Sequence, residues 1–500
     1  MKNILLLLGL VFSLPSWSQP APLKDALKPH LSTLDRICAA YITKNYIPGL
    51  SLGVIYDGRL VHTVNVGKSD VSLRAPATSS TVYRIASMSK SFTAMAILLL
   101  REEKKLSLDD PLAKYFKELK GLTYPTRDAE PITLRHLLTH TAGFPEDNPW
   151  GDRQLSDSDK DFSELLRKKF SFSTTPGTTY EYSNLGFALL GRIITQVANM
   201  PYQDYIRQRI WKPLRMTSTY WEYENVPDIL LAHGYQYLEG RWQEEALLHD
   251  HPKGSWGAMG GMLSSVEDMA AYLQFHLSAW PPSDLQEAKP LRRSAVREMH
   301  RPSSMNGLQP NYMLNGRACP IATGYGYGLR WTLDCEGRTY VGHSGGLPGF
   351  GSHWMVMPEY GLGIVALANR TYAPMTALNM QLLDTLVRLS GLMPRLVPVT
   401  HILEDRKMKL GALIVDWKGA EESGIFAENF FLDYPIERLR RLSADLFARV
   451  GAVRSLGTLV AENRLRGSFT ILCEQGRLEV TFTMSPDNPP LIQSCRIREL

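Results

Sequence analysis

Residues 84–100 read RIASMSKSFTAMAILLL, and the interpretation of the whole sequence starts from this stretch. The apolar run from Phe92 onward predicts a buried, central helix. Ser87 and Lys90 stand three residues apart at the start of that helix, a spacing that places both side chains on one face. The simplest interpretation is a serine cap beside a solvated lysine. At the mouth of a buried helix, however, we expect the two side chains to point into a cleft.

Ser87 and Lys90 have the chemistry of a nucleophile and its base. A serine hydroxyl becomes nucleophilic when a neighbouring base takes its proton, and burial pushes a lysine toward the neutral form that can do so. The helix N-terminus adds free N–H groups and a positive dipole end, which favour a developing oxyanion. Ser87 is the only serine followed three residues later by a lysine.

A second motif is Tyr182-Ser183-Asn184, within TTYEYSNLG at residues 178–186. A tyrosine and an asparagine two residues apart on a turn can point the same way. The phenol can shuttle a proton, and Asn184 can hydrogen-bond a substrate amide. Another Tyr-x-Asn occurs at residues 223–225 in a charged, loop-like context. The first copy precedes an apolar helix, which makes it the better candidate for a pocket wall.

A third motif, GHSGG at residues 342–346, falls where a predicted strand meets a glycine turn. Glycines there allow a substrate to lie along the strand edge and pair with the backbone. Taken singly, His343 is most simply a turn histidine.

Strand patterns flank a long helical region. Residues 49–67 predict two strands around Asp57-Gly58, and residues 327–369 alternate strands with glycine turns. Helical spacing falls at residues 31–46, 131–144 and 183–200, and residues 257–278 predict a glycine-rich turn that leads into a helix capped by Ser264 or Ser265. A sheet built from such distant segments predicts an α+β fold in which helices flank an antiparallel sheet.

The pattern changes after about residue 400. Residues 435–450 have an apolar stripe at helical spacing, and three alternating segments follow, at 469–473, 478–484 and 491–497. These features predict a small accessory domain at 400–500, made of a helix and an antiparallel sheet, with no catalytic motif.

In this order, Ser-x-x-Lys, Tyr-x-Asn and His-Ser-Gly resemble the penicillin-recognising serine hydrolases. This superfamily contains class C β-lactamases, D,D-peptidases and family VIII-type esterases. The resemblance covers about residues 30–390 and extends to the surrounding stretches TVYRIASMSKSFTA, LSLDDPLAKYF, ITLRHLLTHTAGF, PGTTYEYSNLGFALLG and GHSGGLPGF. It implies an α+β domain with an additional all-helical subdomain and an active site between the two.

The resemblance also implies roles for individual residues. Ser87 is then the acylated nucleophile, and Lys90 and Tyr182 share the proton transfers. Asn184 holds the amide of the acyl group, and the backbone N–H groups of Ser87 and Gly346 form the oxyanion hole. His343, Ser344 and Gly345 complete the substrate-binding set, and His136 and His140 are assigned structural roles. No cofactor and no metal is implied.

His343 departs from the β-lactamase pattern, which has a lysine at this position. An unperturbed histidine is only partly charged at neutral pH, so we expect a weaker and pH-dependent grip on substrate carboxylates, tightening toward pH ~6. Some peptidases and esterases of the superfamily have histidine there. This difference favours a peptidase or esterase over a β-lactamase.

The N-terminus has the layout of a secretory signal peptide, assigned to residues 1–18. Lys2 precedes a short apolar run from Ile4 to Leu14, and small residues precede Gln19. Residues 19–395 are then the hydrolase domain. We expect an exported, periplasmic or extracellular protein without a membrane span after cleavage.

Charge and cysteine content narrow the choice of partners. A net charge of +5 without a dense basic block argues against nucleic acid as a binding partner. The expected partner is a small-molecule or peptide substrate, with cell-wall peptide as one candidate.

The five cysteines leave at least one thiol free, and proximity in the sequence suggests Cys319–Cys335 and Cys473–Cys495 as disulfide pairs.

The sequence therefore predicts a serine hydrolase that acts through an acyl-enzyme on amide or ester bonds. A D,D-peptidase, a D-aminopeptidase-like enzyme or an esterase is favoured, and β-lactams are a further substrate class. The alternative is a penicillin-binding sensor or scaffold that does not turn over. Substrate identity is not readable from the motifs.

Overall fold

The computed structural model describes residues 24–168, 170–247, 249, 251–252, 254–287, 289–395 and 397–500. The chain divides into two compact units after Met393, close to the boundary that the sequence predicted at 395–400. The predicted signal peptide at residues 1–18 lies outside the described residues. Within the described ranges, none of the helices has the length and apolar character needed to cross a bilayer.

The first unit is built on a nine-stranded antiparallel sheet in the order β3-β2-β1-β15-β14-β13-β12-β11-β8. The predicted hairpin forms around Asp57 and Gly58, whose φ values of 46° and 70° suit a primed turn. The predicted α+β class is confirmed. The strands are β1 (Gly49–Tyr56), β2 (Arg59–Asp70), β3 (Ala75–Pro76), β8 (Ser304–Gln309), β11 (Ile321–Tyr325), β12 (Arg330–Leu333), β13 (Thr339–Leu347), β14 (Phe350–Met357) and β15 (Leu362–Ala368).

Helices cover both faces of this sheet. Helices α2 (Leu31–Lys44) and α13 (Met375–Ser390) pack on one face, where residues such as Ile364 of β15 form one apolar core. Helices α3 (Ser89–Glu102) and α11 (Val266–Ser278) pack on the other face. There the next residue of β15, Val365, belongs to a second apolar core. Successive strand residues thus point into different cores, which explains why β15 is apolar throughout rather than alternating.

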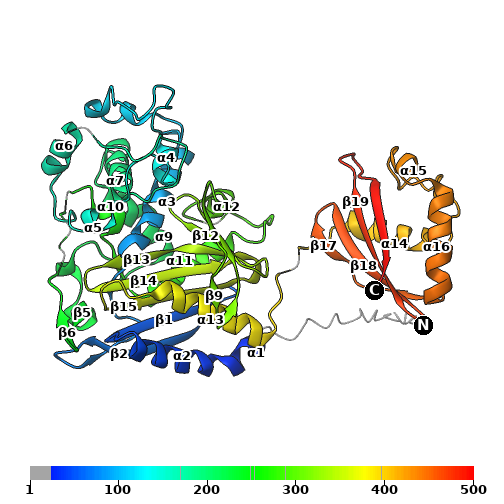
Figure 1. The fold of residues 1–500 in the computed structure, drawn as a ribbon, viewed down its shortest axis with the longest axis horizontal. Coiled ribbons are helices and arrows are strands. Elements are labelled where there is room, and N and C mark those ends of the chain that lie inside the picture. Colours follow the sequence, from blue (N-terminus) through cyan, green and yellow to red (C-terminus); the bar gives the residue numbers. More distant parts are fainter. Residues whose placement is uncertain are drawn as a thin grey trace, which may run out of the picture. The chain divides into compact units, whose positions relative to one another are not determined.

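A helical subdomain completes the first unit. Figure 1 shows α4, α5, α6, α7 and α10 gathered at the end of the unit away from α2 and α13. Their bounds are α4 (Leu134–Leu138), α5 (Asn148–Gly151), α6 (Asp159–Arg167), α7 (Asn184–Ala198) and α10 (Gly257–Gly260).

The helix predicted at residues 131–144 was too long. Only α4 forms there, because Thr133 caps its start through a capping box and the chain leaves helical geometry by His140, which has a φ of 56°. The helix predicted to follow the glycine-rich turn within residues 257–278 is α11, and Ser265, one of the two predicted caps, accepts a hydrogen bond from the Asp268 N–H. The short helix α10 forms where the turn was predicted.

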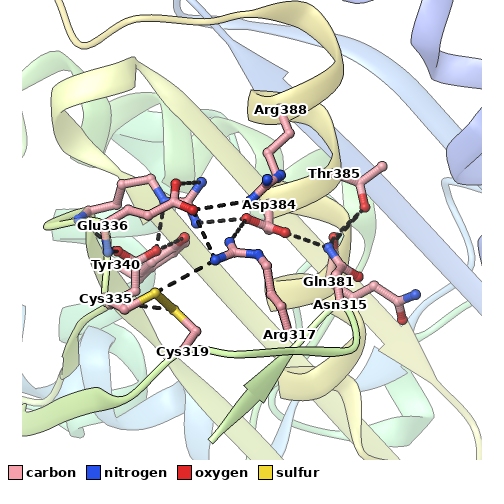
Figure 2. Close-up of polar contacts among 12 residues, drawn as sticks. Asn315, Arg317, Cys319, Cys335, Glu336, Tyr340, Gln381, Asp384, Thr385 and Arg388 are labelled. Atoms are coloured by element: carbon pink, nitrogen blue, oxygen red, sulfur yellow. Dashed lines mark hydrogen bonds and ion pairs between the residues drawn. A yellow bond between two sulfur atoms is a disulfide. The ribbon is translucent and has the colours of Figure 1, made fainter.

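A buried ionic network fastens the turn between β12 and β13 to α13 (Figure 2). Arg338 contacts both Asp334 and Asp384 at 2.7 Å. Arg317 contacts Asp384 at 2.7 Å, as Figure 2 shows. Asp384 is fully buried, and Glu336 adds a further ion pair with Arg317 at 2.9 Å. Removing one partner from such a buried network leaves an uncompensated charge, so the network fixes where this hairpin lies.

The disulfide beside this network joins Cys319 to Cys335, which is one of the two pairs suggested by the sequence. The second suggested pair is wrong, since Cys473 and Cys495 are free thiols, as is Cys38. Cys473 lies on β18 (Arg466–Cys473) and Cys495 on β20 (Ile492–Glu499), and β19 (Arg477–Met484) runs between them. Two intervening strand spacings exceed the reach of a disulfide.

Loss of the Cys319–Cys335 disulfide is expected to lower the free energy of unfolding of the first unit by about 3 kcal/mol, because it closes a loop of modest length. Guanidinium unfolding of the Cys319→Ala/Cys335→Ala variant measures this. Dithiothreitol should bring the natural chain to the same midpoint and leave the variant unchanged. Equal midpoints for the oxidised chain and the variant would contradict the expectation.

The second unit, Pro394–Leu500, has its own core around a five-stranded antiparallel sheet. The helix predicted at residues 435–450 is present as α16, and the three predicted strands are β18, β19 and β20. Two short strands, β16 and β17, pair with β18 and were not predicted. The elements are α14 (His401–Leu413), α15 (Phe430–Asp433), α16 (Ile436–Val450), β16 (Val453–Leu456), β17 (Val460–Asn463), β18 (Arg466–Cys473), β19 (Arg477–Met484) and β20 (Ile492–Glu499).

Candidate active site

Ser87 and Lys90 meet at the start of α3, as their spacing predicted. Ser87 lies in a short 3-10 turn, Ala86–Met88, directly before the helix. The Lys90 Nζ donates a hydrogen bond to the Ser87 Oγ at 3.0 Å. Lys90 is fully buried, whereas Ser87 is 8% exposed and lines a cavity. The hydroxyl is therefore accessible from the cavity, whereas the amine contacts it from the protein interior.

The backbone before Ser87 is held in an uncommon conformation. Ala86 has a φ of 49°, in the left-handed region that residues other than glycine rarely adopt and that recurs at functional sites. Gly345 of β13 packs against it so closely that a Cβ there would lie 2.2 Å from the Ile85 carbonyl oxygen. Gly345 was predicted to bind substrate, but it is not among the residues that line the cavity. Its contacts instead fix the turn that presents Ser87.

Lys90 is held in an environment that favours the neutral amine. Burial lowers the pKa of Lys90 to about 7, although the carboxylates of Asp152 and Asp147 act in the opposite direction. Its Nζ also donates to the Asn184 Oδ1 at 2.6 Å and to the Met259 carbonyl oxygen at 2.7 Å. The amine is thus oriented by three acceptors, and near neutral pH a substantial fraction of it is able to accept a proton.

Tyr182 closes the same corner of the cavity. Its ring centroid lies 4.9 Å from the Lys90 Nζ, and its hydroxyl lies near enough to Ser87 for the serine side chain to act on its pKa. Burial raises the pKa of Tyr182 well above its usual range, so the phenol keeps its proton at neutral pH. In this arrangement the amine of Lys90 can accept a proton and the phenol of Tyr182 can donate one.

Asn184 was predicted to hold a substrate amide, but its contacts are internal. The residue is fully buried; its Oδ1 accepts from Lys90, and its Nδ2 donates to the Asn148 Oδ1 at 3.2 Å. Asn148, from α5, is the amide that lines the cavity. Asp147 beside it accepts hydrogen bonds from the N–H groups of Asn184 and Leu185 and so caps the start of α7.

His343 also differs from its predicted role. It is fully buried, and its Nδ1 lies 2.6 Å from the Ser344 carbonyl oxygen, which can only accept, so this nitrogen carries the proton. Its Nε2 then accepts from the Tyr325 hydroxyl at 2.8 Å. Burial, with Arg330 and Lys90 nearby, lowers the pKa of His343 well below its usual value. The expected partial charge and the tightening of carboxylate binding toward pH 6 are therefore corrected: this imidazole is neutral throughout that range.

The cavity in front of Ser87 has a volume of about 340 Å³ and carries charges of both signs. Ser344 and Gly346 line it, as does the aromatic ring of Tyr372, which covers Gly346. The remaining lining residues are Glu146, Asn148, Pro149, Asp152, Tyr182 and Arg330.

The sequence as a whole places this site in a known family. A sequence model of the family described as Beta-lactamase matches residues 34–387. The chain belongs to the beta-lactamase family. The predicted resemblance is thereby confirmed, and the cavity around Ser87 lies within the matched beta-lactamase region.

Individual proteins that are similar to this chain support its assignment to the beta-lactamase family. "Protein flp" of Staphylococcus aureus strain COL is 31% identical over 342 residues, which make up 67% of this chain and 62% of that protein. A "Beta-lactamase" of Escherichia coli K12 is 28% identical over 390 residues, covering 74% of this chain and 95% of that protein. The solved structure of the octameric penicillin-binding protein homologue from Pyrococcus abyssi is 24% identical, with a TM-score of 0.60 over 94% of this chain and 99% of that one. At that identity the structural match shows the shared fold alone.

Within this beta-lactamase fold, three charged residues of the cavity were missed by the sequence analysis: Glu146, Asp152 and Arg330. Arg330, at the first position of β12, pairs in register with Gly342, so it lies next to the His-Ser-Gly motif. Its guanidinium carbon lies 5.3 Å from the centroid of the Tyr182 ring. Asp152 follows α5 and accepts a hydrogen bond from the Tyr372 hydroxyl at 2.7 Å. Only one feature of the sequence could have indicated Arg330: it is a charged residue on the strand that pairs with the strand carrying the His-Ser-Gly motif.

Proposed function

We propose that the protein is an exported serine hydrolase that cleaves amide or ester bonds of small, peptide-like substrates through an acyl-enzyme. The observation that carries this proposal is the contact between the cavity-facing Ser87 hydroxyl and a buried lysine whose amine is neutral in part near pH 7. A D,D-peptidase, a D-aminopeptidase-like enzyme or an esterase fits best, with β-lactams as a further substrate class. Export rests on the composition of residues 1–18.

Acylation follows from the positions of three side chains. Lys90 takes the Ser87 proton as the Oγ attacks the substrate carbonyl carbon, and the carbonyl π electrons move to oxygen. The N–H groups of Ser87 and Gly346, both at the cavity wall, stabilise that oxyanion. When the tetrahedral intermediate collapses, the bond to the leaving group breaks. The leaving group takes the Tyr182 proton, which Lys90 then replaces.

Deacylation repeats these steps with water as the nucleophile. Water gives its proton to the Tyr182–Lys90 pair, its oxygen bonds to the acyl carbon, and the Ser87 Oγ leaves and is reprotonated. No step in this sequence needs a cofactor or a metal ion.

A hydrolysis panel tests the proposal: nitrocefin, p-nitrophenyl butyrate and a peptide ending in D-Ala-D-Ala, each with the natural chain and with Ser87→Ala. Mass spectrometry after mixing with a penicillin or a fluorophosphonate provides a second measurement. Ser87-dependent turnover with a transient adduct supports the hydrolase. A permanent adduct without turnover indicates a penicillin-binding sensor, and the absence of any adduct indicates a scaffold. Either of these results contradicts the proposal.

Arg330 is expected to provide the positive charge that His343 lacks. No ion pair within 4.0 Å involves Arg330 among the residues that the structure describes, so its charge is available to a substrate carboxylate. Replacing it by glutamine should lower kcat/KM by about 30-fold for substrates with a free carboxylate, and far less for p-nitrophenyl butyrate. Equal losses for both substrate types would contradict this role, whereas His343→Gln should not reproduce the selective effect.

A further inference from the structure

Asp152 is a buried carboxylate on the wall of the active-site cavity. The residue is only 2% exposed, yet it lines the same cavity as Ser87. Its Oδ2 accepts a hydrogen bond from the Tyr372 hydroxyl at 2.7 Å, which fixes the orientation of the carboxylate. Among the described residues no lysine, arginine or histidine forms an ion pair with it within 4.0 Å. A buried, ionised group without a cationic partner is costly to maintain.

Lys90 does not serve as that partner. Its Nζ already makes three hydrogen bonds, to the Ser87 Oγ, the Asn184 Oδ1 and the Met259 carbonyl oxygen, which account for all three protons of the ammonium form. Asp152 therefore influences Lys90 only at longer range. Its carboxylate is held in place at the cavity wall with its negative charge unmatched, which is the condition expected of a group that pairs with a ligand.

The packing around Asp152 shows which part of the cavity it serves. Gly151 packs against Asn184 so closely that a Cβ there would lie 2.7 Å from the Asn184 Cβ. Tyr372, which holds Asp152, covers Gly346, where a Cβ would lie 2.6 Å from the Tyr372 ring. Arg330, by contrast, lies over the Tyr182 ring. The carboxylate of Asp152 thus lies on the side of Ser87 where Asn184 is found. The guanidinium of Arg330 lies on the side of Tyr182.

We propose that Asp152 is a specificity-determining residue that pairs with an ammonium group on the acyl half of the substrate. This inference rests on the proposed function, in which Tyr182 protonates the leaving group and the acyl half therefore extends toward Asn184. The preferred substrates are then amides or esters of an amino acid with a free amino group. A carboxylate on the leaving group would in turn meet Arg330.

Competition measurements test this assignment. p-Nitrophenyl butyrate hydrolysis reports the chemistry of Ser87, and D-alanine anilide and N-acetyl-D-alanine anilide are added as competing ligands that differ in the charged amine. The natural chain should bind the free amine with a Ki at least about tenfold lower than that of the acetylated ligand. Asp152→Asn, which keeps the shape of the side chain, should bring the ratio of the two Ki values close to one.

The ratio is the appropriate measurement because a change in folding stability or in the reactivity of Ser87 affects both ligands equally. Glu146→Gln is the matched control, since Glu146 lines the same cavity but is exposed; it should keep the preference for the free amine. Equal Ki values in the natural chain, or an unchanged ratio in Asp152→Asn, would overturn the inference, as would loss of the preference in Glu146→Gln. If p-nitrophenyl butyrate is not hydrolysed in a Ser87-dependent way, the proposed function fails and the inference falls with it.

The pH dependence of this ratio gives a second measurement. Burial raises the pKa of Asp152 to about 6; the Tyr372 hydroxyl, Lys90 and Arg153 act against this rise, and Asp147 adds to it. Below that pH the carboxyl is protonated and no longer attracts an ammonium ion. The preference for the free amine should therefore be greatest near pH ~7 and decline as the pH falls through about 6; it should also decline above pH ~8, where the α-amine of the ligand loses its own proton. A preference that is constant from pH ~5 to ~8 would contradict the assignment.

Discussion

Ser87→Ala is expected to lower kcat/KM for p-nitrophenyl butyrate by about 10⁵-fold, because removal of the nucleophile eliminates the acyl-enzyme and leaves only the oxyanion contacts. Initial rates at high enzyme concentration measure the loss. Mass spectrometry should find the fluorophosphonate adduct on the natural chain and none on the variant. The cavity itself stays intact, so a ligand such as D-alanine anilide should still bind.

Ser91→Ala is the matched control for this change. Ser91 lies one helical turn further along α3, and its Oγ donates to the Met88 carbonyl oxygen at 2.8 Å, so it is buried in the same helix without lining the cavity. It should retain the activity of the natural chain. If Ser91→Ala lost as much activity as Ser87→Ala, a disturbed helix would explain both results and the assignment of the nucleophile would be refuted.

The parts of the fold and site that the sequence predicted are those encoded locally. The contact between Ser87 and Lys90 follows from a spacing of three residues on one helix, and the hairpin at Asp57-Gly58 follows from turn chemistry. The helix expected at residues 131–144 shows the limit of such patterns. Apolar spacing continued past α4, but the chain turns at His140, whose Nδ1 accepts from the Ser183 N–H at the start of another helix.

Features set by tertiary packing were not predictable. The charge of His343 depends on burial beneath Tyr325, which comes from a different strand. The pairing of Cys473 with Cys495 is prevented by β19, whose position between them is a property of the sheet order. Arg330 and Asp152 belong to no motif, and they reach the cavity only because β12 and α5 converge on Ser87. Motifs thus predicted the contact between Ser87 and Lys90, whereas the charged residues of the cavity were found only in the structure.

Lys90→Met is expected to lower kcat/KM by about 10³-fold, because no other neutral amine lies within reach of the Ser87 hydroxyl among the described residues. Lys90→Arg distinguishes a base from a fixed cation. A guanidinium stays protonated at every accessible pH, so a general base predicts a loss as large as that in Lys90→Met. Substantial activity in Lys90→Arg would instead show that a positive charge suffices.

The pH profile gives the same test without disturbing the packing. Burial lowers the pKa of Lys90 to about 7, and the amine is cationic below that pH and neutral above it. For p-nitrophenyl butyrate, kcat/KM should therefore rise as the pH increases through about 7 and then level off. Asp152→Asn removes a negative charge that raises the pKa of Lys90, so its rising limb should move to lower pH. A profile that falls with increasing pH, or a limb that moves upward in Asp152→Asn, would exclude Lys90 as the base.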